Sequence, residues 1–239
     1  MASEQQYLRR LGAWRAFIYI AIAVAALAWV LVARGATVGS AAPSFSASDL
    51  RGNAEHAARV GQQAPTFSGK DSLGKTESLA QYRGKYVVLE WTNRTCPFTK
   101  KHYDSGNMQA LQQEWTGKGV VWFTLLSSSP SHGSDGYLTA AEENAQMEKV
   151  HAHPTAALLD PSGEIGRMYG AKTTPHMFVI DPAGKLIYAG AIDDKATTDK
   201  DDVKGAKNYV SAALTEAMAG QPVQVAATRP YGCSVKYVN

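Results

Sequence analysis

Cysteine is the residue type in this chain whose surroundings most strongly suggest chemistry, and Cys96 is the first of only two. It follows an apolar, β-branched run over residues 87–91 and precedes Pro97, after which a helical pattern begins. The pattern predicts a buried strand, a polar turn and a helix that begins at the cysteine. Unpaired backbone N–H groups and the positive end of the helix dipole favour the nucleophilic thiolate there. A lone cysteine is also a common small core residue, so both interpretations stay open at this point.

Composition and charge limit the class of protein. The chain has 239 residues, of which 45% are hydrophobic, enough for one substantial core. Four basic residues and one acidic residue lie in the first 41 positions, which leaves 20 of each sign in the rest of the chain. A neutral body without a basic stripe argues against nucleic acid as a partner. Neither cysteine lies in a cluster with zinc-ligand spacing, so the sequence predicts no metal and no other cofactor.

The N-terminal segment predicts a membrane anchor. Residues 16–33 form an uncharged apolar stretch of 18 residues, with Arg9, Arg10 and Arg15 before it and Arg34 after it. The length fits an uncleaved signal anchor, and the positive-inside rule leaves the N-terminus in the cytoplasm. We therefore expect a single-pass protein of the bacterial inner membrane with its domain in the periplasm. Cleavage near residues 39–41, as in a signal peptide, is the alternative, and the body is exported in either case.

The remaining chain divides into a linker, one domain and a tail. Residues 1–34 are the expected anchor, residues 35–59 a flexible linker, residues 60–220 a folded domain, and residues 221–239 a tail that carries Cys233. The patterns within the domain predict, in order, a helix from residue 97 to about 115, a strand at 120–126, a helix from the capping box at 139–142 to about 151, a strand at 156–159, two strands joined by a turn at 181–184, and a helix over about 204–220.

Several short motifs in this domain resemble one family when they are taken in order. They are Gly-x-x-Ala-Pro-x-Phe at 61–67, Asp-x-x-Gly-Lys at 71–75, Ser-Leu-x-x-Tyr-Arg-Gly-Lys at 78–85, the strand that leads to Cys96-Pro97, and Thr174-Pro175 before an apolar strand. Together they resemble the redoxin branch of the thioredoxin superfamily, which includes the peroxiredoxins of the alkyl hydroperoxide reductase/thiol-specific antioxidant family. The resemblance implies a thioredoxin-like α/β fold, with a central mixed sheet flanked by helices, beside the predicted N-terminal transmembrane helix.

The resemblance also implies which residues form the site, and two positions depart from it. Thioredoxins carry a second cysteine three residues after the first, where this chain has Thr99, which cannot form a disulfide. Peroxiredoxins carry a threonine three residues before the reactive cysteine, where this chain has Asn93, so Asn93 is the substrate-binding candidate there. Cys233 could replace the missing second thiol as a resolving cysteine, if the two α-carbons come within about 7 Å. It could also be unpaired, or form a persistent disulfide with Cys96 or with another chain.

Five further residues are candidates. Glu90 matches by position the buried carboxylate of thioredoxins, where burial should raise its pKa and suit it to be a general base, unless a lysine pairs with it. Arg94 could stabilise a thiolate or a bound anion, although a solvated turn arginine is the favoured interpretation. Pro175 matches the cis-proline that faces the reactive cysteine, which places Thr174 and His176 beside the substrate. His176 could tune the sulfur or cap the strand edge.

Three hypotheses of function follow. The preferred one is a peroxiredoxin-like thiol oxidoreductase in which the Cys96 thiolate attacks a peroxide or a disulfide. Cys233 or an external thiol then resolves the product, and an external thiol is the reductant. The second is a single-cysteine thiol-disulfide reductase or isomerase that acts on the disulfides of exported proteins. The third is a non-catalytic thioredoxin-fold module that binds an extended peptide or docks on a membrane protein complex.

Overall fold

The computed structural model describes residues 57–133 and 135–238. The chain separates into two units, residues 1–46 and 47–239, and every described residue belongs to the second. The predicted membrane span at residues 16–33 lies outside the described residues. Among the helices that the structure describes, none combines the length and the apolar character that a membrane crossing needs.

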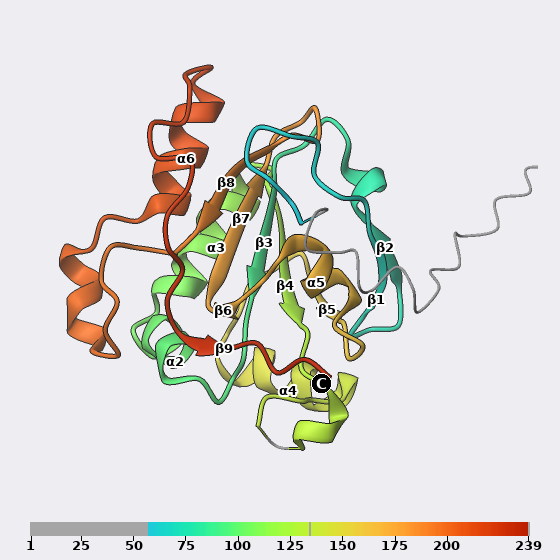
Figure 1. Ribbon diagram of the computed structural model, residues 1–239. Helices are drawn as coiled ribbons and strands as arrows, with labels where there is room; N and C mark the ends of the chain where they lie inside the picture. The colour runs from blue at the N-terminus through green and yellow to red at the C-terminus, as the bar shows by residue number, and fades with distance from the viewer. Residues whose placement is uncertain (1–56, 134, 239) are drawn as a thin grey trace, which may run out of the picture. The chain divides into compact units, whose positions relative to one another are not determined.

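A mixed sheet of seven strands forms the centre of the described unit (Figure 1). The strand order is β2-β1-β5-β4-β3-β7-β8, in which β3, β4 and β5 run parallel and the other neighbours pair antiparallel. The strands are β1 (Ser68–Asp71), β2 (Thr76–Ser78), β3 (Val87–Trp91), β4 (Val121–Leu126), β5 (Ala156–Leu159), β7 (His176–Ile180) and β8 (Leu186–Gly190). The central strands β3, β4 and β7 are buried along their whole length, as expected for strands covered on both faces.

Helices cover both faces of this sheet. They are α2 (Pro97–Asp104), α3 (Asn107–Gly117), α4 (Ala140–Lys149), α5 (Glu164–Tyr169) and α6 (Tyr209–Met218), with short 3-10 helices η1 (Leu79–Tyr82), η2 (Pro130–His132) and η3 (Lys200–Gly205). Because side chains alternate along a strand, Val88 packs with α2, α3 and α6, whereas its neighbour Leu89 packs with α5 on the other face. The strand that leads to Cys96 is thus held in two hydrophobic cores.

The segment after Cys96 forms two helices, so the prediction of one helix to about residue 115 was wrong. The first helix ends at Asp104, and Gly106 caps the second in a left-handed conformation with φ of 75°. Glycine adopts this conformation without the steric penalty that a side chain brings, which allows the chain to change direction there. The predicted helix from residue 204 is also wrong at its start, because α6 begins at Tyr209 after Asn208, whose side chain accepts from the N–H of Ser211 at 2.8 Å.

The tail returns to the site as a short strand. In Figure 1 the red arrow β9 (Cys233–Ser234) lies against β6 (Thr173–Thr174), and the two pair antiparallel with Thr174 opposite Cys233. The bond between Thr174 and Pro175 is cis, as expected for this position. Three segments far apart in the sequence therefore meet at one end of β3.

The break between α2 and α3 gives a stability prediction. We expect Gly106→Ala to lower the free energy of unfolding by about 1 kcal/mol, because alanine is strained at positive φ. The matched control is Gly117→Ala, at the end of α3, where φ is not positive and nothing lies within 4 Å of the added Cβ. That change should leave stability unchanged or raise it by up to about 1 kcal/mol. Urea unfolding of both variants measures the difference, and equal effects at the two sites would contradict the account.

Candidate thiol site

Cys96 is the N-cap residue of α2. Its backbone is extended, with φ of −68° and ψ of 124°, and its carbonyl accepts from the N–H of Lys100 at 2.9 Å to begin the helix. Pro97 occupies the first turn, where its missing N–H leaves no hydrogen bond unmade. The sulfur is therefore at the positive end of the helix dipole, as the sequence predicted. Only 2% of Cys96 is exposed, and both the tail and the segment before β7 contact its sulfur.

Cys233 lies directly against Cys96. The backbone N–H of Cys233 points at the Cys96 sulfur at 3.4 Å, and the Cys96 thiol can donate to the carbonyl of Thr174 at 3.0 Å. Both cysteines are free thiols in this structure. The residue before Cys233 must be glycine, because a Cβ on Gly232 would lie 2.0 Å from the Thr174 carbonyl oxygen. The antiparallel pairing of β9 with β6 therefore brings the tail close enough for the two thiols to interact.

The two thiols have opposite pKa shifts. Burial by itself raises the pKa of Cys96, but hydrogen bonds from the Cys233 thiol, the Thr174 side chain and the backbone N–H groups of Cys233 and Thr99 outweigh it, so the net pKa lies below the ordinary value. Burial, with the neighbouring Cys96 sulfur acting in the same direction, raises the pKa of Cys233 to about 11. In the range between the two pKa values, Cys96 is the thiolate and Cys233 is the thiol that donates to it.

Thr174, Pro175 and His176 surround this pair from the strand side. Thr174 is buried and contacts the Cys96 sulfur through its carbonyl oxygen. His176 is also buried, and its Nδ1 accepts from the N–H of Lys172 at 3.2 Å while its ring packs on Phe178. Burial, with a contribution from Lys172, lowers the pKa of His176 to about 3. The neutral imidazole therefore supports the turn before β6, which favours the strand-capping interpretation over the tuning of the sulfur.

Glu90 lies below the site in the core. It is fully buried, and its carboxylate accepts from Tyr103 at 2.9 Å, from Gln112 at 3.0 Å and from Trp122 at 2.9 Å. Burial raises its pKa, as predicted, although the charge of Arg94 and the three donors oppose the shift. None of these partners is a lysine, so the alternative of a lysine pair was wrong. The three donors come from α2, α3 and β4, which ties this carboxylate to the elements that hold Cys96.

Arg94 is buried, so the favoured interpretation of a solvated turn arginine was wrong. Its Nη2 and Nε donate to the two carboxylate oxygens of Glu143 in α4, at 2.6 Å and 3.3 Å. The guanidinium carbon lies 4.5 Å from the centre of the Tyr103 ring. The exposed fraction of the side chain is 6% for Arg94 and 0% for Glu143. The buried arginine has a buried counter-charge because Glu143, which lies on α4 and 49 residues later in the chain, supplies the carboxylate. Its positive charge is thus fixed beside the turn that carries Cys96.

Asn93 shapes that turn. Its side-chain oxygen accepts from the backbone N–H and from the hydroxyl of Thr95, both at 2.8 Å. This is the usual manner in which asparagine stabilises a turn. Its amide nitrogen lies so close to Gly136 that a Cβ there would come within 2.3 Å. A role for Asn93 in binding substrate stays a prediction.

Two tyrosines, one on each side of Cys233, attach the tail to the domain. Tyr231 contacts His102 and Asp193, and the hydroxyl of Tyr237 donates to the carbonyl of Ala171 at 2.8 Å. The contact partners could not be expected, because Asp193 and His102 lie far from the tail in the sequence and follow no motif.

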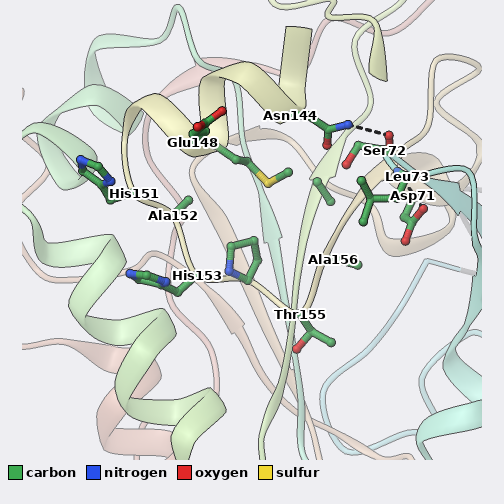
Figure 2. A pocket seen from close by; sticks show the side chains of 13 residues that line it. Asp71, Ser72, Leu73, Asn144, Glu148, His151, Ala152, His153, Thr155 and Ala156 are labelled. Carbon is green, nitrogen blue, oxygen red and sulfur yellow. Dashed lines mark hydrogen bonds between the residues drawn. The ribbon is translucent and has the colours of Figure 1, made fainter. Parts of the chain in front are cut away.

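Figure 2 shows a hollow that is lined by neither cysteine. Its volume is about 400 Å³. It is bounded by the end of α4, the start of β5 and the turn between β1 and β2, where Asn144 donates to the carbonyl of Ser72 at 2.9 Å. His151 and His153 border it, but no group of three metal-ligating side chains occurs within residues 57–133 and 135–238. The hollow contains no cysteine, so thiol chemistry does not use it.

The sheet order, the cysteine at the N-terminus of α2 and the cis-proline before β7 define a thioredoxin-like protein. Comparison with protein families makes this more specific: the AhpC/TSA family matches residues 60–189, which is more than half of the chain. The chain therefore belongs to the AhpC/TSA family, the redoxin family that the motifs resembled.

Solved structures share the fold at low sequence identity. An uncharacterized conserved protein from Geobacillus kaustophilus is similar with a TM-score of 0.62 and 22% identity, over 75% of this chain and 93% of the other. A hypothetical protein from Sinorhizobium meliloti 1021 has a TM-score of 0.63 and 20% identity, over 75% of this chain and 95% of the other. No curated protein matches the sequence. These similarities show the fold alone.

The opposite pKa shifts of the two thiols predict reciprocal effects of removing either one. In Cys233→Ala the Cys96 thiolate loses its hydrogen bond from the partner thiol, so the pKa of Cys96 should rise. In Cys96→Ala the pKa of Cys233 should fall from about 11, because the neighbouring sulfur that opposes its ionisation is gone. Ultraviolet absorbance of the thiolate during a pH titration measures both without requiring access for a reagent. Unchanged pKa values in both variants would show that the thiols do not interact.

Proposed function

We propose that this protein is a thiol-dependent oxidoreductase of the peroxiredoxin type, with Cys96 as the nucleophile and Cys233 as the resolving cysteine. The observation that carries the proposal is the contact of the Cys233 strand with the Cys96 sulfur. Membership of the AhpC/TSA family agrees with thiol chemistry. The pKa of Cys96 is lowered, which favours the nucleophilic thiolate over the thiol.

The proposed reaction begins at the Cys96 thiolate. It attacks the terminal oxygen of a peroxide, the O–O bond breaks, and Cys96 becomes a sulfenic acid while the leaving alkoxide or hydroxide takes up a proton. The Cys233 thiol then attacks the sulfenic sulfur, which releases water and forms a Cys96–Cys233 disulfide. Two equivalents of an external thiol return both cysteines to the reduced state by thiol-disulfide exchange.

The surrounding residues would support this sequence in different ways. The fixed charge of Arg94, which is neutralised by Glu143, and the buried Glu90 contribute to the electrostatic environment below the turn. Glu90 is the candidate for accepting a proton, since burial raises its pKa. The carbonyl of Thr174, directly before Pro175, lies 3.0 Å from the Cys96 sulfur and can accept from the protonated thiol.

A protein disulfide is the second candidate substrate, and one observation favours it. The edge of β6 pairs with an extended segment whose cysteine lies at the Cys96 sulfur. An extended cysteine-containing segment of an exported protein could pair with the same edge if β9 moved away. In that reaction the Cys96 thiolate would attack the substrate disulfide, form a mixed disulfide and release the other substrate thiol.

One equivalent of hydrogen peroxide tests the proposed reaction. In the reduced protein we expect a Cys96–Cys233 disulfide as the main product, identified by mass mapping of peptides. Cys233→Ser should instead accumulate a sulfenic acid at Cys96, which a dimedone-type reagent traps. Cys96→Ser should form neither product, and its peroxide consumption should fall by more than about a hundredfold if the thiolate is the nucleophile.

The same experiment separates the alternatives. Slow peroxide oxidation together with fast exchange with a disulfide-containing peptide would contradict the peroxidase and support the disulfide reductase. A Cys96 that reacts with neither oxidant would contradict both enzymatic functions and leave the binding module.

We further infer that residues 16–33 anchor the protein in the inner membrane of a bacterium with the domain in the periplasm. The apolar length and the excess of arginine before the span support this orientation. In a bacterial host, the full chain should sediment with membranes, and its domain should be digested by protease added to spheroplasts but not to intact cells. A chain that begins at Gly35 is the control and should remain in the soluble fraction. Protection of the domain in spheroplasts would contradict the orientation.

A further inference from the structure

One face of α2, the helix that begins at Cys96, contacts a single tail residue, Tyr231. The ring of Phe98 lies 5.9 Å from the ring of Tyr231, and the ammonium of Lys101 lies 5.7 Å from the same ring. The Nε2 of His102 lies 3.2 Å from the Tyr231 hydroxyl. Positions three and four apart share a face of a helix, so these three residues form one surface for the tyrosine. Tyr231 lies two residues before Cys233.

The hydrogen bonds around the Tyr231 hydroxyl have one consistent direction. Burial lowers the pKa of His102 to about 4, so its ring is neutral at pH 7 and carries one hydrogen. The hydroxyl donates to Asp193, so it must accept from His102 Nε2, and His102 Nδ1 must then accept from the side-chain amide of Asn107 at 3.0 Å. The chain of donors runs from Asn107 through His102 and Tyr231 to Asp193, and every hydrogen in it has an acceptor.

The acceptor at the end of this chain is a buried charge. Asp193 is 2% exposed, and its other carboxylate oxygen lies 3.9 Å from the ammonium of Lys101, which is buried as well and donates to the carbonyl of Lys195 at 2.6 Å. A buried carboxylate depends on every donor that it has. The hydroxyl of Tyr231 is therefore bound in a polar site that the domain supplies in advance, with residues from α2 and from the segment after β8.

The tail beyond Cys233 is held differently. The ion pair of Lys236 with Asp135, at 3.0 Å, leaves the aspartate side chain 57% exposed. Ion pairs at such exposed positions contribute little to stability. The hydroxyl of Tyr237 donates to one neutral backbone carbonyl, its ring centre lies 4.5 Å from the guanidinium carbon of Arg167, and backbone hydrogen bonds also hold this end of the tail. The attachment before Cys233 is thus buried and charge-assisted, whereas the ion pair after it faces solvent.

We propose that Tyr231 is the positioning residue of the thiol pair: it holds the tail on α2 so that Cys233 stays within reach of Cys96 when no disulfide joins them. Gly232, between anchor and cysteine, carries no side chain that would obstruct the approach to Thr174. Tyr231 contacts α2, whose N-cap residue is Cys96, so it fixes the proposed resolving thiol relative to the nucleophile itself. This inference rests on the proposed two-thiol function.

Equilibration of the full chain with reduced and oxidised glutathione measures the effect directly and needs no peroxide. The Cys96 thiolate attacks glutathione disulfide and releases one glutathione thiolate, and Cys233 then displaces the second to close the intramolecular disulfide. The equilibrium constant, in concentration units, is the effective concentration of the two cysteines. In Tyr231→Phe the tail must be ordered anew before the disulfide closes, and the constant should fall about tenfold or more.

The matched control is Tyr237→Phe, which removes the other hydroxyl of the same tail and should change the constant by less than about threefold. Phe98→Ala keeps all the hydrogen bonds and removes only the ring contact, so it should lower the constant in the same direction as Tyr231→Phe. It also serves as the test if Tyr231→Phe does not fold, as judged by circular dichroism. A folded Tyr231→Phe protein with an unchanged constant, or an equal fall in Tyr237→Phe, would overturn the proposal.

If the unaltered protein forms no Cys96–Cys233 disulfide, the proposed function itself fails. This outcome differs from a disulfide that forms equally well in Tyr231→Phe, which contradicts only the positioning role.

Discussion

The pairing of β9 with β6 is the contact on which the site depends. It joins the end of the tail to the segment before Pro175, and it brings Cys233 to a sulfur 137 residues earlier in the chain. Without this pairing, Cys96 would be a lone thiol at a helix N-terminus, with a thiolate favoured by the dipole but no second sulfur. With it, one tail strand contacts the Cys96 sulfur and carries the second cysteine. The thiol of that cysteine also contributes to the lowered pKa of Cys96.

Each buried charged side chain around the sulfur has at least one polar partner, although Nη1 of Arg94 and Oδ2 of Asp193 have no hydrogen-bond partner among the described residues. Glu90 has three donors, and Arg94 has the carboxylate of Glu143. Asp193 has the Tyr231 hydroxyl and lies near Lys101. A buried charge without such partners would cost several kcal/mol. Glu90 is bonded to α2 and α3, Arg94 to α4, and Asp193 to the tail. Elements that do not contact the Cys96 sulfur therefore help to hold the segment that carries it.

The family and the fold do not by themselves determine which reaction the protein catalyses. The similar structures from Geobacillus kaustophilus and Sinorhizobium meliloti share the fold at sequence identities of 22% and 20%. One fold supports many functions, so the chemistry must be argued from the side chains. Here the departures from thioredoxin and peroxiredoxin motifs, Thr99 and Asn93, lie in the same turn-helix segment as Cys96, while the second cysteine comes from the tail. Thioredoxins carry both cysteines in one helix segment, whereas here the second cysteine that lies near Cys96 comes from the tail.

Local sequence patterns were sufficient to predict the strand and the start of the helix that flank Cys96. The apolar runs of β3 and β4, the capping box of α4 and the placement of Cys96 before Pro97 all depend on residues within a few positions of each other, and the motifs gave the family and the cis-proline by resemblance. The break at Gly106, the burial of Arg94 and the contacts of His102 were not predicted, because their causes lie in distant parts of the chain. The same is true of the approach of Cys233: sequence could name the two cysteines, but only the tertiary structure decided that a two-residue strand holds them together, since pairing between distant segments leaves no periodic pattern in either one.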